Sequence, residues 1–322
     1  MPRASIVVSA YNTLKTLPET VASLLAQDFN DFEVLVVDDG STDGTADWVL
    51  AHPDPRLRLV RQLNRGLAGA RNGGIAEARG EYIGFCDGDD LWEPEKLAVH
   101  VAFLDANPTV GLTYSGATLI NENGAPLGLA QTPKAENVTA RDVLLRNPVG
   151  NGSTPVIRRA CLDDIVFRPE GETRDQWFDE TFRQSEDIEC WLRIVLTTSW
   201  DIAGTSAPLM RYRIVSSGLS ANIIRQFDTW LRVADRVYQV APEFARAHIP
   251  AAKAYQLRYL ARRAVTLGAG PTALSLMLRS GLSSMHPLLN EPAKTLSTLA
   301  AALVVSLGGG SLVQFALKGK AA

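Results

Sequence analysis

Residues 33–45 read EVLVVDDGSTDGT, a run of apolar and β-branched residues that ends in two adjacent aspartates and a turn. Such runs are typical of buried strands, and the glycine and serine that follow favour a turn. Similar strand signals occur at residues 5–9 (SIVVS), 57–60 (LRLV) and 81–86 (EYIGFC). Residues 16–27 and 67–79 are predicted helices between the strands. This alternation predicts an α/β fold with a mainly parallel sheet and helices on both faces.

The regular alternation of strands and helices ends near residue 91. Residues 94–107 read as a helix, and residues 110–121 read as a strand or a hairpin. Residues 123–135 are rich in Gly, Pro and Ala and predict a loop. Residues 185–198 predict another helix, and from residue 221 onward the chain is expected to be nearly all helical.

Composition and charge exclude several classes of protein. The 322 residues carry 32 Lys plus Arg against 35 Asp plus Glu, which gives a formal charge of −3 and no reason to expect nucleic-acid binding. The three cysteines and four histidines are scattered, which argues against a disulfide scaffold and against a zinc site. The N-terminal apolar stretch is too short for a secretory signal, so a cytoplasmic location is expected.

Two acidic clusters follow predicted strands: Asp38-Asp39, and Asp87-Gly88-Asp89-Asp90. Ligands of open α/β sheets bind at the carboxyl ends of the strands. Crowded carboxylates repel one another and attract a cation, and oxygen ligands suit Mg²⁺ or Mn²⁺ bound to phosphates. The alternative is a pair of solvated turns in which aspartates cap the next helix.

Four motifs stand in order along the chain: SIVVSAYN (5–12), EVLVVDDGSTDGT (33–45), GLAGARNGGIAEARG (66–80) and YIGFCDGDD (82–90). They resemble the donor-binding half of the family 2 inverting glycosyltransferases, which have the GT-A fold, a Rossmann-like α/β fold of the spore-coat-polysaccharide-synthesis type. The resemblance covers about residues 4–220 and implies a catalytic domain over 1–220, with a nucleotide-binding half (1–106) and an acceptor half (107–220). Residues 221–322 are expected to form a helical C-terminal extension outside it.

The resemblance implies a role for each residue of the donor site. Ala10, Tyr11 and Asp39 would form the base pocket, with Tyr11 stacked on the base and Asp39 accepting a hydrogen bond from a ring N–H such as that of uracil. Arg71 would reach the nucleotide or its phosphates, and Asp87 would hold the ribose. The alternatives are a turn cap for Asp39 and a surface ion pair for Arg71.

By the same resemblance, Asp89 ligates Mn²⁺ or Mg²⁺ on the pyrophosphate of a nucleotide-sugar donor. The ion would stabilise the charge that develops on the leaving nucleoside diphosphate. Asp90 would either support that ligand or cap the next helix. Many relatives carry a histidine in the loop that corresponds to residues 212–220 (YRIVSSGLS), and Val215 stands about where it would be. Metal coordination would then rest on Asp89, phosphates and water.

An inverting transfer also needs a base that deprotonates the acceptor hydroxyl. Residues 185–193 (SEDIECWLR), which follow Phe178-Asp179-Glu180, resemble the family segment that supplies it. This implies that Asp187 is the general base and that Glu186 positions the sugar or the acceptor. The alternative is that these acids only complement a helix N-terminus. Trp191 is expected in the core.

The acceptor would be a saccharide or a lipid-linked saccharide in surface polysaccharide or cell-envelope synthesis. Processive relatives carry a Gln-x-x-Arg-Trp motif, and residues 226–230 (QFDTW) lack its arginine, which predicts a non-processive enzyme. Two other functions compete: a catalytically silent protein that binds nucleotide sugars, and a sugar nucleotidyltransferase. The latter would carry a Gly- and Arg-rich loop after the first strand, and a dehydrogenase would have Gly-x-Gly-x-x-Gly there, whereas the chain has Ser9-Ala10-Tyr11-Asn12.

The C-terminal extension contains an uncharged stretch at residues 295–317, flanked by Lys294, Lys318 and Lys320. The stretch has about the length of a membrane span, but three glycines at 308–310 interrupt it. Two interpretations stay open. The helices contact the inner face of the plasma membrane peripherally, or they form a packed subdomain or a homodimer interface.

Overall fold

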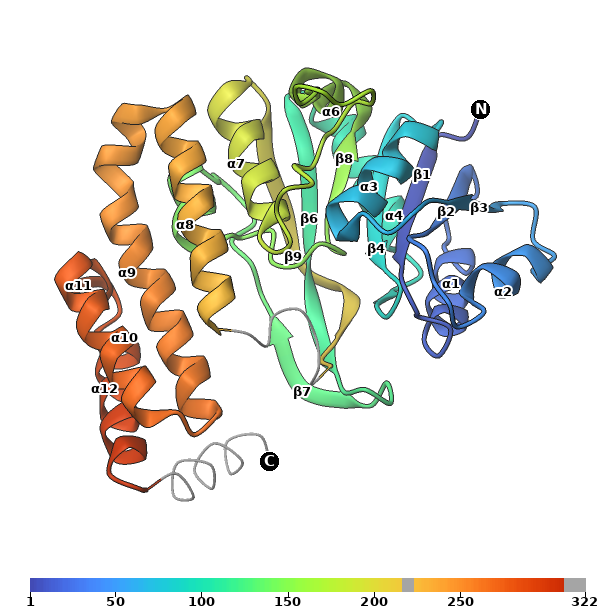
Figure 1. Ribbon diagram of the computed structural model, residues 1–322. Helices are drawn as coiled ribbons and strands as arrows, with labels where there is room; N and C mark the ends of the chain where they lie inside the picture. The colour runs from blue at the N-terminus through green and yellow to red at the C-terminus, as the bar shows by residue number, and fades with distance from the viewer. Residues whose placement is uncertain (216–222, 310–322) are drawn as a thin grey trace. The chain divides into compact units, whose positions relative to one another are not determined.

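The computed structural model of the chain describes residues 1–215 and 223–309, which fall into two compact units (Figure 1). Unit 1 comprises Met1–Ala140 and Pro148–Val215. Unit 2 comprises Arg141–Asn147 and the helices beyond residue 222. The expected division at residue 220 lies outside the described residues. Nothing in the sequence indicated that a short segment near residue 144 groups with the C-terminal helices.

Four parallel strands form one half of the sheet in unit 1, in the order β3-β2-β1-β4. All four were predicted from the sequence. The register places Ala10 beside Asp38 and Ser9 beside Asp87, so the carboxyl ends of three strands are level. The strands are β1 (Ala4–Ala10), β2 (Phe32–Asp38), β3 (Leu57–Arg61) and β4 (Tyr82–Asp87).

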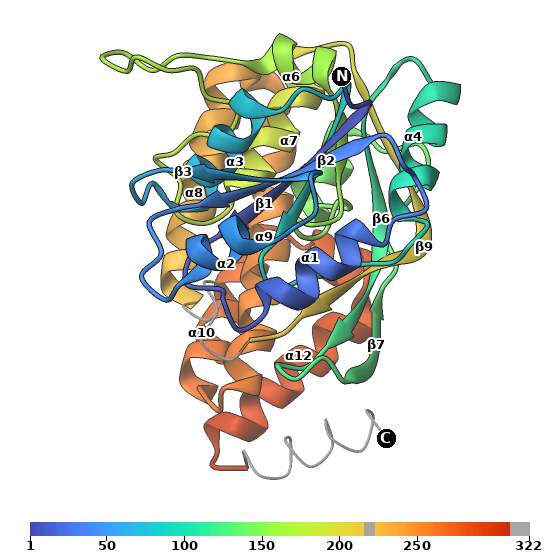
Figure 2. The same cartoon turned by 90° about the vertical axis from the view of Figure 1, so that its right-hand side faces the viewer.

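Helices cover both faces of this half-sheet, as the alternation predicted (Figure 2). On one face, Ile6 and Val8 belong to a core shared with α1, α2 and α4. On the other face lies α3, whose Gly74 sits so close to Val7 that a Cβ would fall 2.2 Å from a Val7 methyl carbon. The glycines of α3 therefore let its backbone approach the strands. The helices are α1 (Leu17–Leu25), α2 (Thr45–Ala51), α3 (Gly66–Glu77) and α4 (Lys96–Ala106).

The second half of the sheet is mixed, so the expectation of a mainly parallel sheet is confirmed for the first four strands but not for the whole sheet. β8 runs antiparallel to β4, and β6 runs parallel to β9. The loop expected at residues 123–135 is wrong, because it contains β7, which pairs with β6. The side chains of β7 are largely exposed, so no alternation of buried residues marks it. The remaining elements of unit 1 are β5 (Leu91–Trp92), β6 (Val110–Ile120), β7 (Pro126–Gln131), β8 (Val156–Arg158), β9 (Asp201–Arg213), α6 (Arg159–Ile165) and α7 (Glu186–Thr197).

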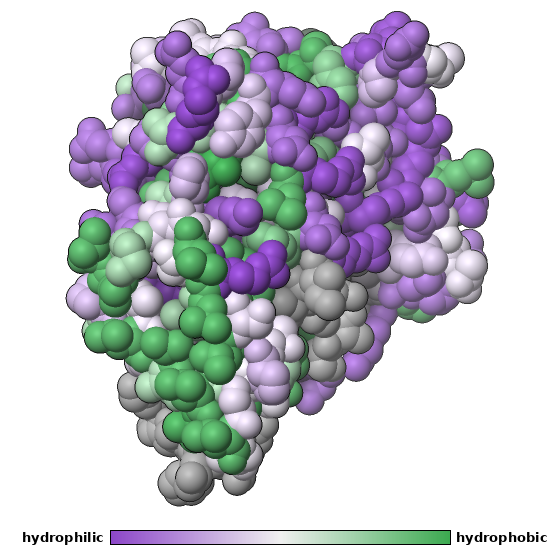
Figure 3. All heavy atoms as spheres, turned by 60° about the vertical axis from the view of Figure 1, so that its left-hand side comes forward, coloured by the Kyte–Doolittle hydropathy of each residue, from purple (hydrophilic) through white to green (hydrophobic). Residues whose placement is uncertain are grey.

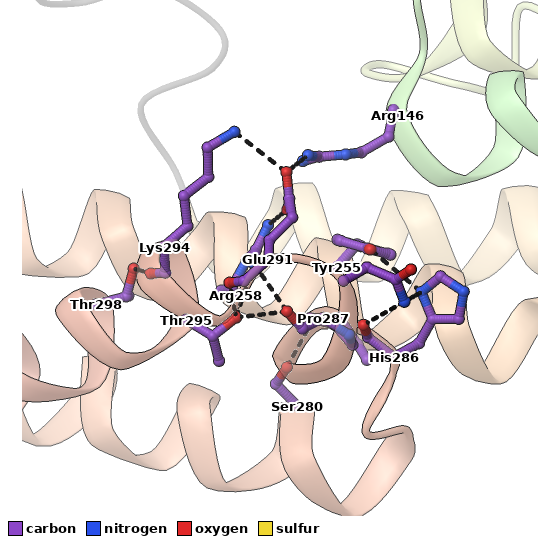
Figure 4. A network of polar contacts seen from close by, with 12 residues as sticks. Arg146, Tyr255, Arg258, Ser280, His286, Pro287, Glu291, Lys294, Thr295 and Thr298 are labelled. Carbon is purple, nitrogen blue, oxygen red and sulfur yellow. Dashed lines mark hydrogen bonds and ion pairs between the residues drawn. The ribbon is translucent and has the colours of Figure 1, made fainter.

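Unit 2 is helical, as expected, and α9 packs against α8, α10, α11 and α12. An ion-pair network around Glu291 ties its helices together (Figure 4). Glu291 accepts hydrogen bonds from Arg146 of α5, from Arg258 of α9 and from Lys294 of α12. Burial alone would raise the pKa of Glu291, but these cations lower it to about 2. The helices are α5 (Ala140–Arg146), α8 (Ile223–Val240), α9 (Pro242–Thr266), α10 (Gly270–Ser283), α11 (His286–Asn290) and α12 (Pro292–Ser306).

The uncharged stretch at residues 295–317 corresponds in part to α12, and its residues 310–317 lie outside the described residues. Thr298, Ala302 and Val305 form the buried face of α12. None of the helices within residues 1–215 and 223–309 combines the length and the hydropathy needed to span a bilayer.

Candidate active site

The carboxyl ends of β1, β2 and β4 bring the acidic clusters to one edge of the sheet. The Asp39 N–H donates to the Ala10 carbonyl at 2.9 Å, and the Gly88 N–H donates to the Ser9 carbonyl at 3.0 Å. Both segments are thus tied to the end of the central strand β1. The arrangement is the one expected for a ligand site at the carboxyl ends of parallel strands.

Asp39 is 2% exposed, and its carboxylate already holds protein donors. Oδ1 accepts from Gln62 Nε2 at 2.7 Å and from the Arg65 N–H at 2.9 Å, and Oδ2 accepts from the Gly66 N–H at 2.8 Å. The carboxylate therefore caps the start of α3 rather than the turn that follows β2. A carboxylate has about four acceptor positions, so one remains for a further donor.

Tyr11 follows β1 and is 53% exposed, whereas Ala10 is buried. The neighbouring Asn12 adopts a left-handed backbone with φ of 53° and fastens this loop to the one after β2. Asn12 Oδ1 accepts from the Thr42 N–H at 2.8 Å, and the Asn12 N–H donates to Ser41 Oγ at 2.9 Å. The exposed phenol ring of Tyr11 therefore lies on a loop that is held by β1 on one side and by the Asn12 hydrogen bonds on the other.

The turn after β4 is built around Asp87, Asp89 and Asp90. Asp90 is fully buried, and its carboxylate accepts from Ser153 Oγ at 2.6 Å and from the Arg213 N–H at 2.9 Å. It thus joins the turn to the chain before β8 and to the end of β9. The reading of Asp90 as a cap of the next helix is wrong, because both acceptor oxygens face these other segments.

Asp89 lies in an environment that disfavours its negative charge. Desolvation by burial, and next the negative charge of Asp87, raise the pKa of Asp89 to about 6. Its carboxylate is therefore poorly compensated by the protein. Within residues 1–215 and 223–309, no group of three or more His, Cys, Asp or Glu side chains is placed to hold a metal by itself. A single carboxylate of this kind suits an ion whose other ligands come from phosphate and water.

Arg71 connects the turn after β4 with the acidic residues at the start of α7. Its guanidinium donates from Nη2 to Asp87 Oδ1 at 3.2 Å and from Nη1 to Glu186 Oε1 at 2.8 Å. Arg71 is 1% exposed, so the alternative of a surface ion pair is wrong. Gly152 lies against the guanidinium, since a Cβ there would fall 2.0 Å from Nη2. Nε of Arg71 is buried and has no hydrogen-bond partner in the described structure.

Glu186 and Asp187 are the first two residues of α7. This position is compatible with a catalytic base and with acids that complement a helix N-terminus. Burial raises the pKa of both carboxyls, and the positive charge of Arg71 opposes the rise. Glu186 is 5% exposed and paired with Arg71. Asp187 is only partly buried, and its Oδ1 accepts from the Ile188 N–H at 2.7 Å. Trp191 is 1% exposed, which confirms it as a core residue.

Asn72, next to Arg71, holds the segment that leads into α7. Its side chain accepts from the Trp177 and Phe178 N–H groups at 3.0 and 2.9 Å, and it donates to the Phe178 carbonyl at 2.8 Å and to Glu180 at 2.9 Å. Two adjacent residues of α3 thus hold this part of the chain: Asn72 contacts residues 177–180, and Arg71 contacts Glu186 at the start of α7. Sequence reasoning assigned no role to Asn72, although it lies inside one of the four motifs.

Arg213, at the end of β9, was also missed. Its Nε donates to the Asp89 carbonyl at 2.7 Å, and its Nη2 donates to Glu19 at 2.7 Å. The side chain is 2% exposed, so it forms a buried brace under the aspartate turn. The nearby Val215 is described, but residues 216–220 of the expected closing loop lie outside the described residues.

Comparisons with known proteins agree on one family. Residues 5–155 match the family model described as glycosyl transferase family 2. The chain is 30% identical over 223 residues to the UDP-Glc:alpha-D-GlcNAc-diphosphoundecaprenol beta-1,3-glucosyltransferase WfgD of Escherichia coli, which covers 69% of this chain and 81% of that protein. It is 29% identical over 251 residues to the putative teichuronic acid biosynthesis glycosyltransferase TuaG of Bacillus subtilis, covering 77% of this chain and 90% of that protein.

A solved structure shows the same fold. The mannosyltransferase PcManGT from Pyrobaculum calidifontis, in complex with GDP-Man and Mn²⁺, superposes with a TM-score of 0.58. The two chains are 22% identical, and the match covers 96% of this chain and 87% of the other. The GT-A fold inferred from the sequence is therefore confirmed.

Proposed function

Because this chain belongs to glycosyltransferase family 2, we propose that it moves a hexose from a nucleoside-diphosphate sugar to a saccharide or lipid-linked saccharide, with inversion and without processivity. Residues 1–220 would form the catalytic domain, with the nucleotide bound by 1–106 and the acceptor by 107–220. The observation that carries the proposal is the buried Arg71, whose guanidinium joins Asp87 at the end of β4 to Glu186 at the start of α7. This contact links the donor side and the acidic segment in one charged network.

In the proposed reaction, Asp187 takes the proton of the acceptor hydroxyl. The hydroxyl oxygen forms a bond to the anomeric carbon, and the bond from that carbon to the β-phosphate oxygen breaks with its electron pair. The nucleoside diphosphate leaves, and the sugar is inverted because attack and departure occur on opposite faces. The raised pKa of Asp187 makes it a better proton acceptor than an ordinary aspartate.

Glu186 holds Arg71, and Arg71 holds Asp87, so this line of ion pairs keeps donor and base at a constant separation. We assign Glu186 the task of positioning through Arg71. Arg71 would act on the donor side through its ion pair with Asp87, because its own side chain is almost fully buried. Asp87, with a side chain 25% exposed, remains accessible to a ribose hydroxyl. Tyr11 and Asp39 would contact the base, with Ala10 as the floor of the pocket.

Asp89 is the residue that would hold Mn²⁺ or Mg²⁺, since burial and the neighbouring negative charge of Asp87 raise its pKa, and a cation would offset both effects. Once bound, the ion would neutralise charge on the departing diphosphate. Arg213 would keep the Asp89 backbone in place through its bond to the carbonyl oxygen. The mannosyltransferase of the same fold contains Mn²⁺, which supports the assignment.

Replacing Arg213 with methionine is expected to weaken Mn²⁺ binding by about 10–100-fold, because residues that orient a ligand from behind contribute this much to affinity. Calorimetric titration of Mn²⁺ into the protein saturated with UDP measures the effect. Arg213→Lys should restore part of the affinity, since an ammonium can reach one of the same oxygens. Arg211→Met is the matched control, because Arg211 lies two residues earlier on β9 and pairs with Glu93 at the exposed surface. Equal Mn²⁺ affinity in the Arg213 and Arg211 variants would remove the bracing role.

The donor is proposed to be a UDP-sugar, since the name of the similar Escherichia coli enzyme specifies UDP-Glc. A ligand that binds only the folded state raises the melting temperature, and at 100 times its Kd it adds about 2.7 kcal/mol. We therefore expect a rise of roughly 5 °C with a UDP-hexose and Mn²⁺, and a smaller one with GDP- or dTDP-sugars. A thermal-shift screen over these donors, with and without Mn²⁺, checks the preference. A larger shift with a GDP-sugar would reassign the base.

Donor hydrolysis distinguishes the proposed transferase from the two competing functions. An active enzyme releases nucleoside diphosphate slowly in water, whereas a silent donor-binding protein gives a thermal shift and no release. A sugar nucleotidyltransferase instead produces pyrophosphate from a nucleoside triphosphate and a sugar phosphate. Equal nucleotide release by the wild type, Asp89→Ala and Asp187→Asn would overturn the transferase assignment.

A further inference from the structure

The helices α10, α11 and α12 of unit 2 expose large apolar side chains. Leu282 is 88% exposed, Leu289 is 76% exposed and Leu307 is 87% exposed. Figure 3 shows hydrophobic residues gathered at the lower left of the molecule, where Figure 1 places these helices. Isolated exposed leucines are ordinary, but a contiguous group marks a contact surface.

The exposed leucines follow helical spacing. On α12, Leu296 and Leu303 are seven residues apart, so they lie on the same face of the helix, and both are exposed. The buried residues of α12 are Thr298, Ala302 and Val305. Both faces of α12 are therefore apolar, although only one contacts the rest of unit 2. We call the outward-facing set the leucine surface; it consists of Leu278, Leu282, Leu289, Leu296, Leu303 and Leu307.

The helices that carry the leucine surface pack side by side. α10 contacts α12 directly, and the start of α10 touches the end of α12, where a Cβ on Gly270 would fall 2.3 Å from the Ser306 nitrogen. The Glu291 network fixes the start of α12 against α9 (Figure 4). The exposed leucines thus project from a braced helical scaffold.

The C-terminal helical region is strongly positive. Residues 244–322 contain nine Lys or Arg and a single acidic residue, Glu291, which gives +8 in a chain whose total is −3. Glu291 is itself paired with Arg146, Arg258 and Lys294. Arg262 and Arg279 are exposed on α9 and α10, and Lys294 is exposed next to Leu296. Exposed leucines in a region of net positive charge are complementary to a surface that offers both apolar chains and negative charge.

We propose that the leucine surface docks on an anionic lipid membrane, with the leucines inserted among the acyl chains and the flanking cations on lipid phosphates. The inference rests on the proposed function, since a lipid-linked acceptor resides in that membrane. Docking would raise the local concentration of acceptor around the enzyme. A second copy of the chain is the less favoured occupant, because two such surfaces would bring their positive charges together.

Sedimentation with lipid vesicles tests the proposal. The full-length protein is expected to bind vesicles that contain phosphatidylglycerol, to bind pure phosphatidylcholine weakly, and to be released by salt. The variant Leu282→Ser/Leu289→Ser/Leu307→Ser is expected to lower partitioning by about 1,000-fold, because each of the three inserted leucines contributes roughly tenfold. The matched control is Leu50→Ser/Leu63→Ser/Leu129→Ser, three exposed leucines of unit 1, which should bind as the wild type does.

Three outcomes would overturn the docking proposal: no binding of the wild type to anionic vesicles, equal binding of the two triple variants, or a wild-type dimer that the first variant dissociates without any lipid binding. Donor hydrolysis in vesicle-free buffer keeps this test separate from the proposed function. The variant of the leucine surface should release nucleotide at the wild-type rate. If the wild type binds vesicles but does not hydrolyse the donor, the proposed transferase reaction is wrong and the proposal of membrane docking is retained.

Discussion

Asp187→Asn is expected to lower kcat by about 10²–10⁴-fold, the range that a positioned general base contributes. Asparagine keeps the shape of the side chain but cannot take the proton of the acceptor hydroxyl. Donor binding should be unchanged, because the contacts of Arg71 run to Asp87 and Glu186 rather than to Asp187. Transfer kinetics together with a thermal shift on donor addition separate the two effects.

The pH profile gives an independent check on Asp187. The base must be ionised to act, so the rate falls as pH falls through its pKa. Because burial raises that pKa, the acidic limb should lie above the value of about 3.9 for an unperturbed aspartate. Asp187→Asn should remove the limb, while Asp163→Asn, at an exposed position of α6, should leave both rate and profile unchanged. A wild-type rate in the Asp187 variant would exclude this residue as the base.

Asp89→Asn is expected to abolish metal-dependent turnover, with a loss of about 10³-fold. A metal ion supplies several kcal/mol of transition-state stabilisation, and the described residues contain no group of three or more His, Cys, Asp or Glu side chains that could hold the ion without Asp89. Steady-state kinetics over a Mn²⁺ titration measure the loss. A variant that retains the wild-type Mn²⁺ dependence would show that the ion is held elsewhere.

The same variant should not be less stable than the wild type in the absence of metal. The pKa of Asp89 is higher in the folded protein, at about 6, than in the unfolded chain, so the folded state binds its proton more tightly. Stability from this group is present below about pH 4 and is lost as pH rises through 6, which costs roughly 2–3 kcal/mol at pH 7. Asparagine carries no such charge. Urea unfolding at pH 7 without metal therefore distinguishes a functional loss from a folding defect.

Local signals in the sequence account for much of the first half of the fold. The β-branched runs at β1, β2 and β4 are short, buried and bounded by turns, so their periodicity needs no information from distant residues. β7 escaped prediction because an exposed strand has no buried alternation, and its stability comes from pairing with β6. The leucines of α10 escaped because their exposure depends on which face of the helix α9 and α12 cover.

The sequence by itself determined that aspartates terminate β2 and β4 and that an acidic pair opens α7, because each of these is a property of neighbouring residues. Only the tertiary structure decided which charges meet. Arg71 lies 115 residues from Glu186, and Arg213 lies 124 residues from Asp89, yet each contacts its partner directly. Pairings at such separation depend on the packing of α3 against the sheet and on the pairing of β9 within it. Only the folded chain excludes the water that would otherwise solvate each charge.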